Sequence, residues 1–142
     1  GCDSLAIAIG TSHGPCKFSG EATLDFARLE AVAVRLPGVP LVLHGASSVP
    51  QEAVAAVNAY GGNVADASGV PENLLRRAAA SAICKINIDT DLRLAVTAAI
   101  RTSLREHPEA FDPRAYLSAG RDAVRAMVRH KIRDVLGSSG RA

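Results

Sequence analysis

Polar residues suited to catalysis or ligand binding follow three short apolar runs of this chain. Residues 5–9 lead into His13, and residues 41–43 lead directly into His44. The third run, residues 84–88, includes Asn87 and is followed by Asp89 and Thr90. Parallel α/β folds place their active sites at the carboxyl ends of their strands. The pattern therefore predicts one site built from three loops.

His13 and His44 are the candidate metal ligands. They follow consecutive expected strands, and neighbouring parallel strands lie about 4.8 Å apart. Two imidazoles at such strand ends can converge on one ion, and zinc accepts histidine nitrogens. The alternative is that both are loop histidines held only by hydrogen bonds. His107 and His130 lie in charged, helix-like surroundings and are expected at the surface.

The remaining polar residues suit a phosphate group. Gly14 and Gly45 permit close backbone approach, and successive backbone N–H groups in such turns bind anions. Lys17 adds a positive charge. The alternative for the hydroxyl residues is that they only cap helices. The candidate phosphate-site residues are Gly14, Lys17, Gly45, Ser47, Asn87, Asp89 and Thr90.

Helical spacing follows each expected strand, which predicts a parallel α/β fold. Helices are expected over 23–36, from about residue 50 to 60, from 71 to about 78, over 92–105 and over 113–136. Thr23 is the expected cap of the first helix, and Ser47 or Ser48 that of the second. The last helix carries one apolar stripe, with arginine and lysine on the opposite side; the members of the stripe are Leu117, Val124, Val128, Ile132 and Val135.

Three strands are too few for a closed barrel, which needs eight. The chain starts only a few residues before its first expected strand. We therefore expect residues 1–142 to form one partial domain of a larger fold, with a flexible tail over 137–142.

Composition excludes several classes of protein. The net charge of +2 and the aromatic content of 4% argue against nucleic-acid binding. No run approaches the roughly 18 apolar residues of a membrane span. The three cysteines form no CxxC pair, so ordinary thiols in a reducing, cytoplasmic setting are expected.

Four segments together resemble the class II, metal-dependent fructose-bisphosphate aldolases. They are residues 3–14 (DSLAIAIGTSHG), 41–50 (LVLHGASSVP), 85–93 (KINIDTDLR) and 111–114 (FDPR). The likeness extends over nearly the whole chain. The Ala46-Ser47-Ser48 variant resembles a subgroup that includes Calvin-cycle enzymes, alongside those of glycolysis.

The resemblance implies the C-terminal part of a (βα)8 TIM barrel, about strands 6–8 plus the C-terminal helices. It implies that His13 and His44 are two of three histidine ligands of a catalytic Zn²⁺. It places the candidate phosphate-site residues around the phosphate of dihydroxyacetone phosphate, with Arg93 also facing substrate. Arg114, with Asp112, would reach the second phosphate in a neighbouring subunit of a homo-oligomer.

The resemblance also implies the activity, which is reversible cleavage of fructose 1,6-bisphosphate to dihydroxyacetone phosphate and glyceraldehyde 3-phosphate. The metal would act as a Lewis acid. The family's third histidine ligand and its acid–base aspartate lie on an earlier strand, and no segment here matches that motif. No catalytic residue is therefore assigned, and the isolated chain is expected to be inactive or nearly so.

Three alternatives remain open from the sequence. A tagatose-bisphosphate aldolase would differ in sugar stereochemistry, and a product assay with both sugars distinguishes the two. The chain could also be a non-catalytic half-barrel fragment, or a protein that binds zinc or phosphate without catalysis.

Overall fold

A computed structural model of the chain describes residues 1–11, 22–64 and 66–141. Its described part has a small parallel sheet with the strand order β1-β2-β3. The strands are β1 (Leu5–Ile7), β2 (Leu41–Leu43) and β3 (Ile83–Ile86). The predicted strands are thus confirmed, although β1 and β3 end earlier than the apolar runs.

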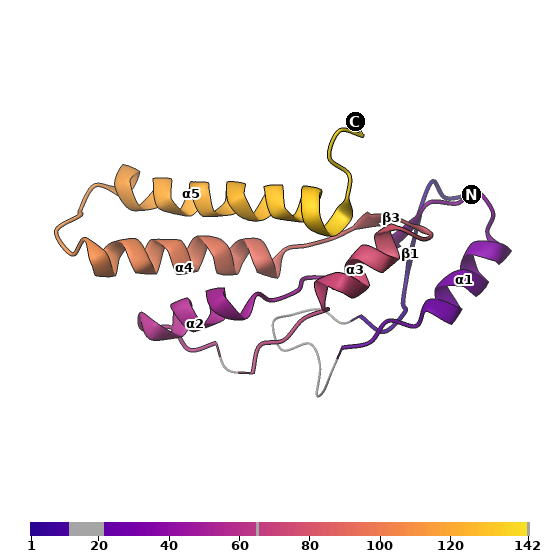
Figure 1. Cartoon of the computed structure of the whole chain (residues 1–142), viewed down its shortest axis with the longest axis horizontal. Helices are drawn as coiled ribbons and strands as arrows, with labels where there is room; N and C mark the ends of the chain where they lie inside the picture. The colour runs from indigo at the N-terminus through magenta and orange to yellow at the C-terminus, as the bar shows by residue number, and fades with distance from the viewer. Residues whose placement is uncertain (12–21, 65, 142) are drawn as a thin grey trace.

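Five α-helices accompany the sheet within the described residues (Figure 1). None of them combines the length and hydropathy that crossing a membrane requires. The helices are α1 (Phe26–Arg35), α2 (Gln51–Ala59), α3 (Glu72–Ala79), α4 (Thr90–Glu106) and α5 (Pro113–His130), and the last continues into a π-helical turn, η1 (Lys131–Leu136).

Helix α1 follows β1 and precedes β2, so the strand–helix–strand order is confirmed. Its cap differs from the prediction, because Asp25 rather than Thr23 accepts the N–H of Arg28, at 2.8 Å. Helices α4 and α5 form a long antiparallel hairpin whose far end lies remote from the sheet (Figure 1). The sheet therefore meets the hairpin only where α4 begins and α5 ends.

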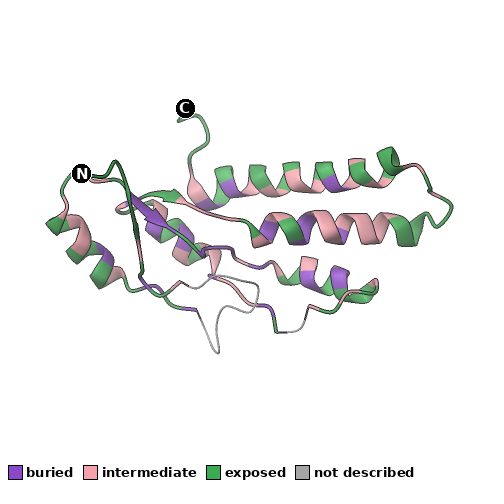
Figure 2. Ribbon diagram, turned by 180° about the vertical axis from the view of Figure 1, so that it is seen from behind, coloured by how far each residue is buried: buried purple, intermediate pink, exposed green. Residues whose placement is uncertain are grey.

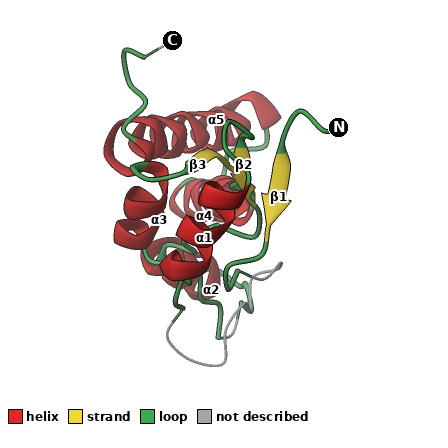
Figure 3. Ribbon diagram, turned by 90° about the vertical axis from the view of Figure 1, so that its right-hand side faces the viewer, coloured by secondary structure: helices red, strands yellow, loops and turns green. Residues whose placement is uncertain are grey.

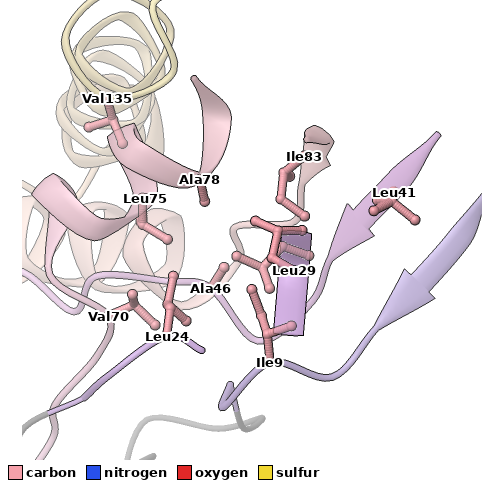
Figure 4. Close-up of a cluster of buried hydrophobic side chains, with 11 residues drawn as sticks. Ile9, Leu24, Leu29, Leu41, Ala46, Val70, Leu75, Ala78, Ile83 and Val135 are labelled. Atoms are coloured by element: carbon pink, nitrogen blue, oxygen red, sulfur yellow. The ribbon is translucent and has the colours of Figure 1, made fainter. Parts of the chain in front are cut away.

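The main core lies between the sheet and helices α1 and α3. Leu29 of α1, Leu75 of α3 and Leu43 of β2 are fully buried there, and Val135 of η1 closes it (Figure 4). A second apolar cluster joins α2 to the first half of α4, through Val57 and Leu94 among others. The loops that follow β2 and β3 therefore lie between the main core and this second cluster.

Burial differs sharply between the strands. All three residues of β2 are buried, whereas β1 is largely exposed, with Leu5 at 37% (Figure 2). The absence of polar alternation over residues 5–9 is typical of a strand covered on both faces, but β1 is not covered in this way. Viewed along the hairpin, β1 lies at the outer edge of the sheet (Figure 3). The expected flexible tail over 137–142 stays a prediction.

Candidate functional site

A cleft of about 860 Å³ opens at the carboxyl ends of β2 and β3, beside the start of α4. Its apolar wall comes partly from Val57 of α2 and Leu94 of α4. Among the predicted site residues, those that line it are His44, Gly45, Ser47, Asn87, Asp89, Thr90 and Arg93. Residues more than 40 positions apart in the chain therefore meet in one concave surface.

His44 and Asn87 face each other across the ends of β2 and β3. The backbone N–H of Asn87 donates to the carbonyl of Leu43 at 2.9 Å, which extends the parallel pairing by one residue. The side-chain nitrogen of Asn87 lies 3.1 Å from Nδ1 and 3.0 Å from Nε2 of His44. The side-chain amide of Asn87 therefore lies against the imidazole of His44.

Ser47 joins the loop after β2 to the start of α4. Its Oγ accepts the backbone N–H groups of Asp89, at 3.2 Å, and of Thr90, at 3.1 Å. It is buried, with 2% exposure. The prediction that Ser47 or Ser48 caps the second helix is wrong, because α2 has no side-chain cap. Ser47 instead caps α4 from another segment, which proximity in sequence could not reveal.

Two arginines expected near substrate occupy different places. Arg93 lines the cleft and pairs with Asp89 at 2.9 Å, and this contact raises the pKa of the guanidinium. Arg114 lies at the start of α5, at the far end of the hairpin, and is 90% exposed. It pairs with Asp112, whose pKa lies below its usual value because Arg114 donates to it. The structure therefore does not bring Arg114 to the cleft of its own chain.

His13, Gly14 and Lys17 lie outside the described residues, so their approach to the cleft stays a prediction. His44 has the donor chemistry that zinc uses, a ring nitrogen at a strand end. The described part of the site thus fits one ligand of a zinc ion.

A buried ionic network supports the same loop, and sequence reasoning missed it. Asp91 is fully buried and pairs with Lys131 of η1 at 2.8 Å. Lys131 also pairs with Glu72 of α3, and Glu72 meets His130 at 2.8 Å. His130, which was expected at the surface, is 41% exposed and also takes part in this network. The available signal was an aspartate in the first turn of α4 with a lysine among the apolar residues that follow α5.

The pKa values in this network follow from its contacts. Burial alone would raise the pKa of Asp91, but the hydrogen bonds from Lys131 and from two backbone N–H groups outweigh it and lower the pKa. The pKa of Glu72 is lowered in the same way, against burial, by Lys131 and His130. The hydrogen bond to Glu72 raises the pKa of His130. Both carboxylates are therefore charged at neutral pH.

The family model and the curated relatives that match this chain carry the same name. The family model described as "Fructose-bisphosphate aldolase class-II" matches residues 1–141. A fructose-bisphosphate aldolase of Treponema pallidum is 52% identical over the whole of this chain and 46% of its own length. Aldolases of the same name from Giardia intestinalis and Thermus caldophilus are each 49% identical, over 44% and 46% of their lengths.

The chain spans less than half the length of these relatives. The match nevertheless covers the three strand ends and the hairpin, which include the residues of the cleft. The chain therefore belongs to the class II fructose-bisphosphate aldolase family.

Proposed function

We propose that this chain supplies one phosphate site and part of the metal site of a class II fructose-1,6-bisphosphate aldolase. The observation that carries the proposal is the cleft, which joins His44, Ser47 and Asn87 at two adjacent strand ends. The chain would be the last part of a (βα)8 barrel. Its small parallel sheet and the following helices are consistent with that origin.

Ser47 and Gly45 would bind the phosphate of dihydroxyacetone phosphate. The Ser47 oxygen already accepts two N–H groups, so both of its acceptor positions are used and its O–H remains to donate. A phosphate oxygen is the matching acceptor. Gly45 has φ of +62°, which favours glycine and allows close backbone approach. The start of α4 adds the positive end of a 17-residue helix.

His44, together with His13, would hold a zinc ion. When bound, zinc supplies Lewis-acid polarisation of the substrate carbonyl. The side-chain nitrogen of Asn87 lies within 3.1 Å of the His44 ring nitrogens. Arg93 would meet the charged substrate at the edge of the cleft, where Asp89 holds its guanidinium.

Arg114 supports a homo-oligomer in the complete enzyme. Its position at the remote end of the hairpin suits contact with a site on another subunit better than with its own. Asp112 also caps α5 by accepting the N–H of Arg114 at 2.9 Å, so the pair is anchored to the helix start. We propose that this anchored pair contributes to the second phosphate site of a neighbour.

The isolated chain should not catalyse aldol cleavage, because no residue here matches the family's third histidine or its acid–base aspartate. The test is to assay cleavage of fructose 1,6-bisphosphate by the purified chain with added zinc. The full-length enzyme serves as the positive control. Turnover in the ordinary enzymatic range of about 1–1000 s⁻¹ would overturn the assignment of an incomplete site.

Binding is a separate test of the same proposal. Titration of the labelled chain with dihydroxyacetone phosphate should shift the amide resonances of Gly45 and Ser47. Dihydroxyacetone without phosphate is the matched control and should shift them little. Equal shifts with both compounds would contradict a phosphate site.

A further inference from the structure

The loop between β2 and α2, residues 44–50, contains a residue with a strained backbone, Val49, two positions after Ser47. Val49 has φ of +54°, a region that β-branched residues rarely adopt. Such a conformation costs of order 1–3 kcal/mol and persists only when surrounding contacts enforce it. The contacts that enforce it act on the two residues that follow Ser47.

Asp91 supplies those contacts from the first turn of α4. Its Oδ1 accepts the backbone N–H of Val49 at 2.7 Å. Its Oδ2 accepts the backbone N–H of Ser48 at 2.9 Å and the Ser48 hydroxyl at 3.0 Å. One carboxylate therefore binds two consecutive amides of the loop.

Lys131 makes this arrangement possible. A fully buried carboxylate is unfavourable unless it is paired with a positive charge. The Nζ of Lys131 lies 2.8 Å from Oδ2 of Asp91, and it also donates to the Ser48 hydroxyl at 2.8 Å. The lysine side chain is itself only 5% exposed. A residue 83 positions after Ser48 thus neutralises the group that holds the loop.

The opposite side of the loop is held by a close backbone approach. The N–H of Val70 donates to the carbonyl of Ser47 at 3.0 Å. A Cβ at Gly69 would lie 2.3 Å from that carbonyl oxygen and 2.5 Å from the carbonyl carbon of Ser48. Asp91 and the 69–70 segment therefore clamp the loop between them.

We propose that Lys131 is a positioning residue for anion binding: through Asp91 it holds the 44–50 loop so that the Ser47 hydroxyl faces the phosphate. The identity of the ligand as a phosphate rests on the proposed function, whereas the role of Lys131 in holding the loop does not. It assigns a role at the cleft to the turn that follows α5, in a part of the chain that does not line the cleft.

The test compares Lys131→Met with the wild-type chain by two measurements. Amide hydrogen exchange at Ser48 and Val49 should accelerate at least about tenfold. The variant removes the charge-assisted contact between Lys131 and Asp91, the residue that binds these two amides. The dissociation constant for inorganic phosphate, from an amide titration, should rise by a similar factor. Arg129→Met removes a neighbouring exposed charge and should change neither. Lys131→Arg keeps the charge and should restore most of both.

A purely structural role would give a different pattern. Exchange would then rise uniformly across the chain, and phosphate affinity would be unchanged in the folded fraction. That result, or failure of Lys131→Arg to restore the loop, would overturn the proposal. Where Lys131→Met does not fold, the double variant Asp91→Asn/Lys131→Met removes both charges, and it should still show faster exchange at Ser48 and Val49 and weaker phosphate binding.

The two proposals fail separately. If the wild-type chain does not bind phosphate, the proposed function fails, while local exchange still decides whether Lys131 holds the loop. If the wild type binds phosphate and Lys131→Met binds it equally well with unchanged exchange, the proposed function stands and the role of Lys131 is wrong.

Discussion

Ser47 connects the two strand ends that line the cleft. Ser47 lies in the loop after β2, yet its Oγ accepts two backbone N–H groups at the start of α4, the helix that follows β3. Hydroxyl caps normally act within their own helix. Here the cap joins two strand–helix units. A single hydroxyl therefore holds the loop after β2 and the loop after β3 together around the proposed phosphate.

Replacing Ser47 with alanine should affect both stability and binding. Loss of a helix cap typically costs about 1 kcal/mol. The loss of the O–H donor should weaken phosphate binding by about tenfold. Urea unfolding and a phosphate titration measure the two effects.

Ser68→Ala is the matched control for this change. The Ser68 hydroxyl is buried and has no hydrogen-bond partner among the described residues, so its removal should be neutral or slightly stabilising. If Ser68→Ala cost as much as Ser47→Ala, the hydrogen bonds of Ser47 would not explain its effect.

Among the described residues, the predicted site residues at the ends of β2 and β3 line the cleft, because chemistry at strand ends follows from local pattern. It could not identify the partners of Ser47 or of Asp91. Those contacts join residues 40 or more positions apart, and nothing in the local pattern indicates them. His130 shows the same limit, since its neighbour Glu72 lies 58 positions away.

At the scale of elements, α5 shows where periodicity misleads. The helix was predicted correctly, but its apolar stripe is buried only in part: Val135 is 1% exposed, whereas Leu117 is 54% and Ile132 40% exposed. The buried residue of α5 is Gly120. A Cβ at Gly120 would lie 2.8 Å from Val96 of α4, so the two helices approach more closely than large side chains would allow.

His130 should make the junction between α3 and η1 sensitive to pH. Glu72 and Asp134 both accept from its ring, and Glu72 has the larger part in raising its pKa above the usual 6.5. A raised pKa in the folded state stabilises the protein fully below the unfolded value of 6.5. That contribution is lost as the pH rises through the folded value.

Urea unfolding between pH 5.5 and 8.5 measures this dependence. We expect stability to decline toward the upper end by less than about 1 kcal/mol from this residue, since the pair is partly exposed. His130→Gln should flatten the decline, whereas His107→Gln, at an exposed position, should not. A decline that persists unchanged in His130→Gln would assign the effect to another group.

For the whole molecule, the important feature is an open sheet. Within the described residues β1 and β3 form its two edges, and β1 is poorly covered. Exposed strand edges pair readily with other chains. In a complete barrel, closure would remove both edges.

The isolated chain should therefore self-associate. Size-exclusion chromatography with light scattering, at tens of micromolar, should give a mass above the 14.7 kDa of the monomer. Leu5→Lys places a charge on the edge strand and should shift the mass toward monomer. Val34→Lys, on exposed α1 surface, is the control and should not. A monodisperse wild-type monomer would count against the half-barrel interpretation.

Gly69 limits how this chain can vary. The residue does not line the cleft, and nothing in its own chemistry suggests activity. Even one methyl group there would collide with the backbone on which Ser47 and Ser48 lie. The absence of a side chain at Gly69 thus sets the distance between its own segment and the segment of Ser47 and Ser48. A substitution there would displace Ser47, and with it the lining of the cleft, without touching the cleft itself.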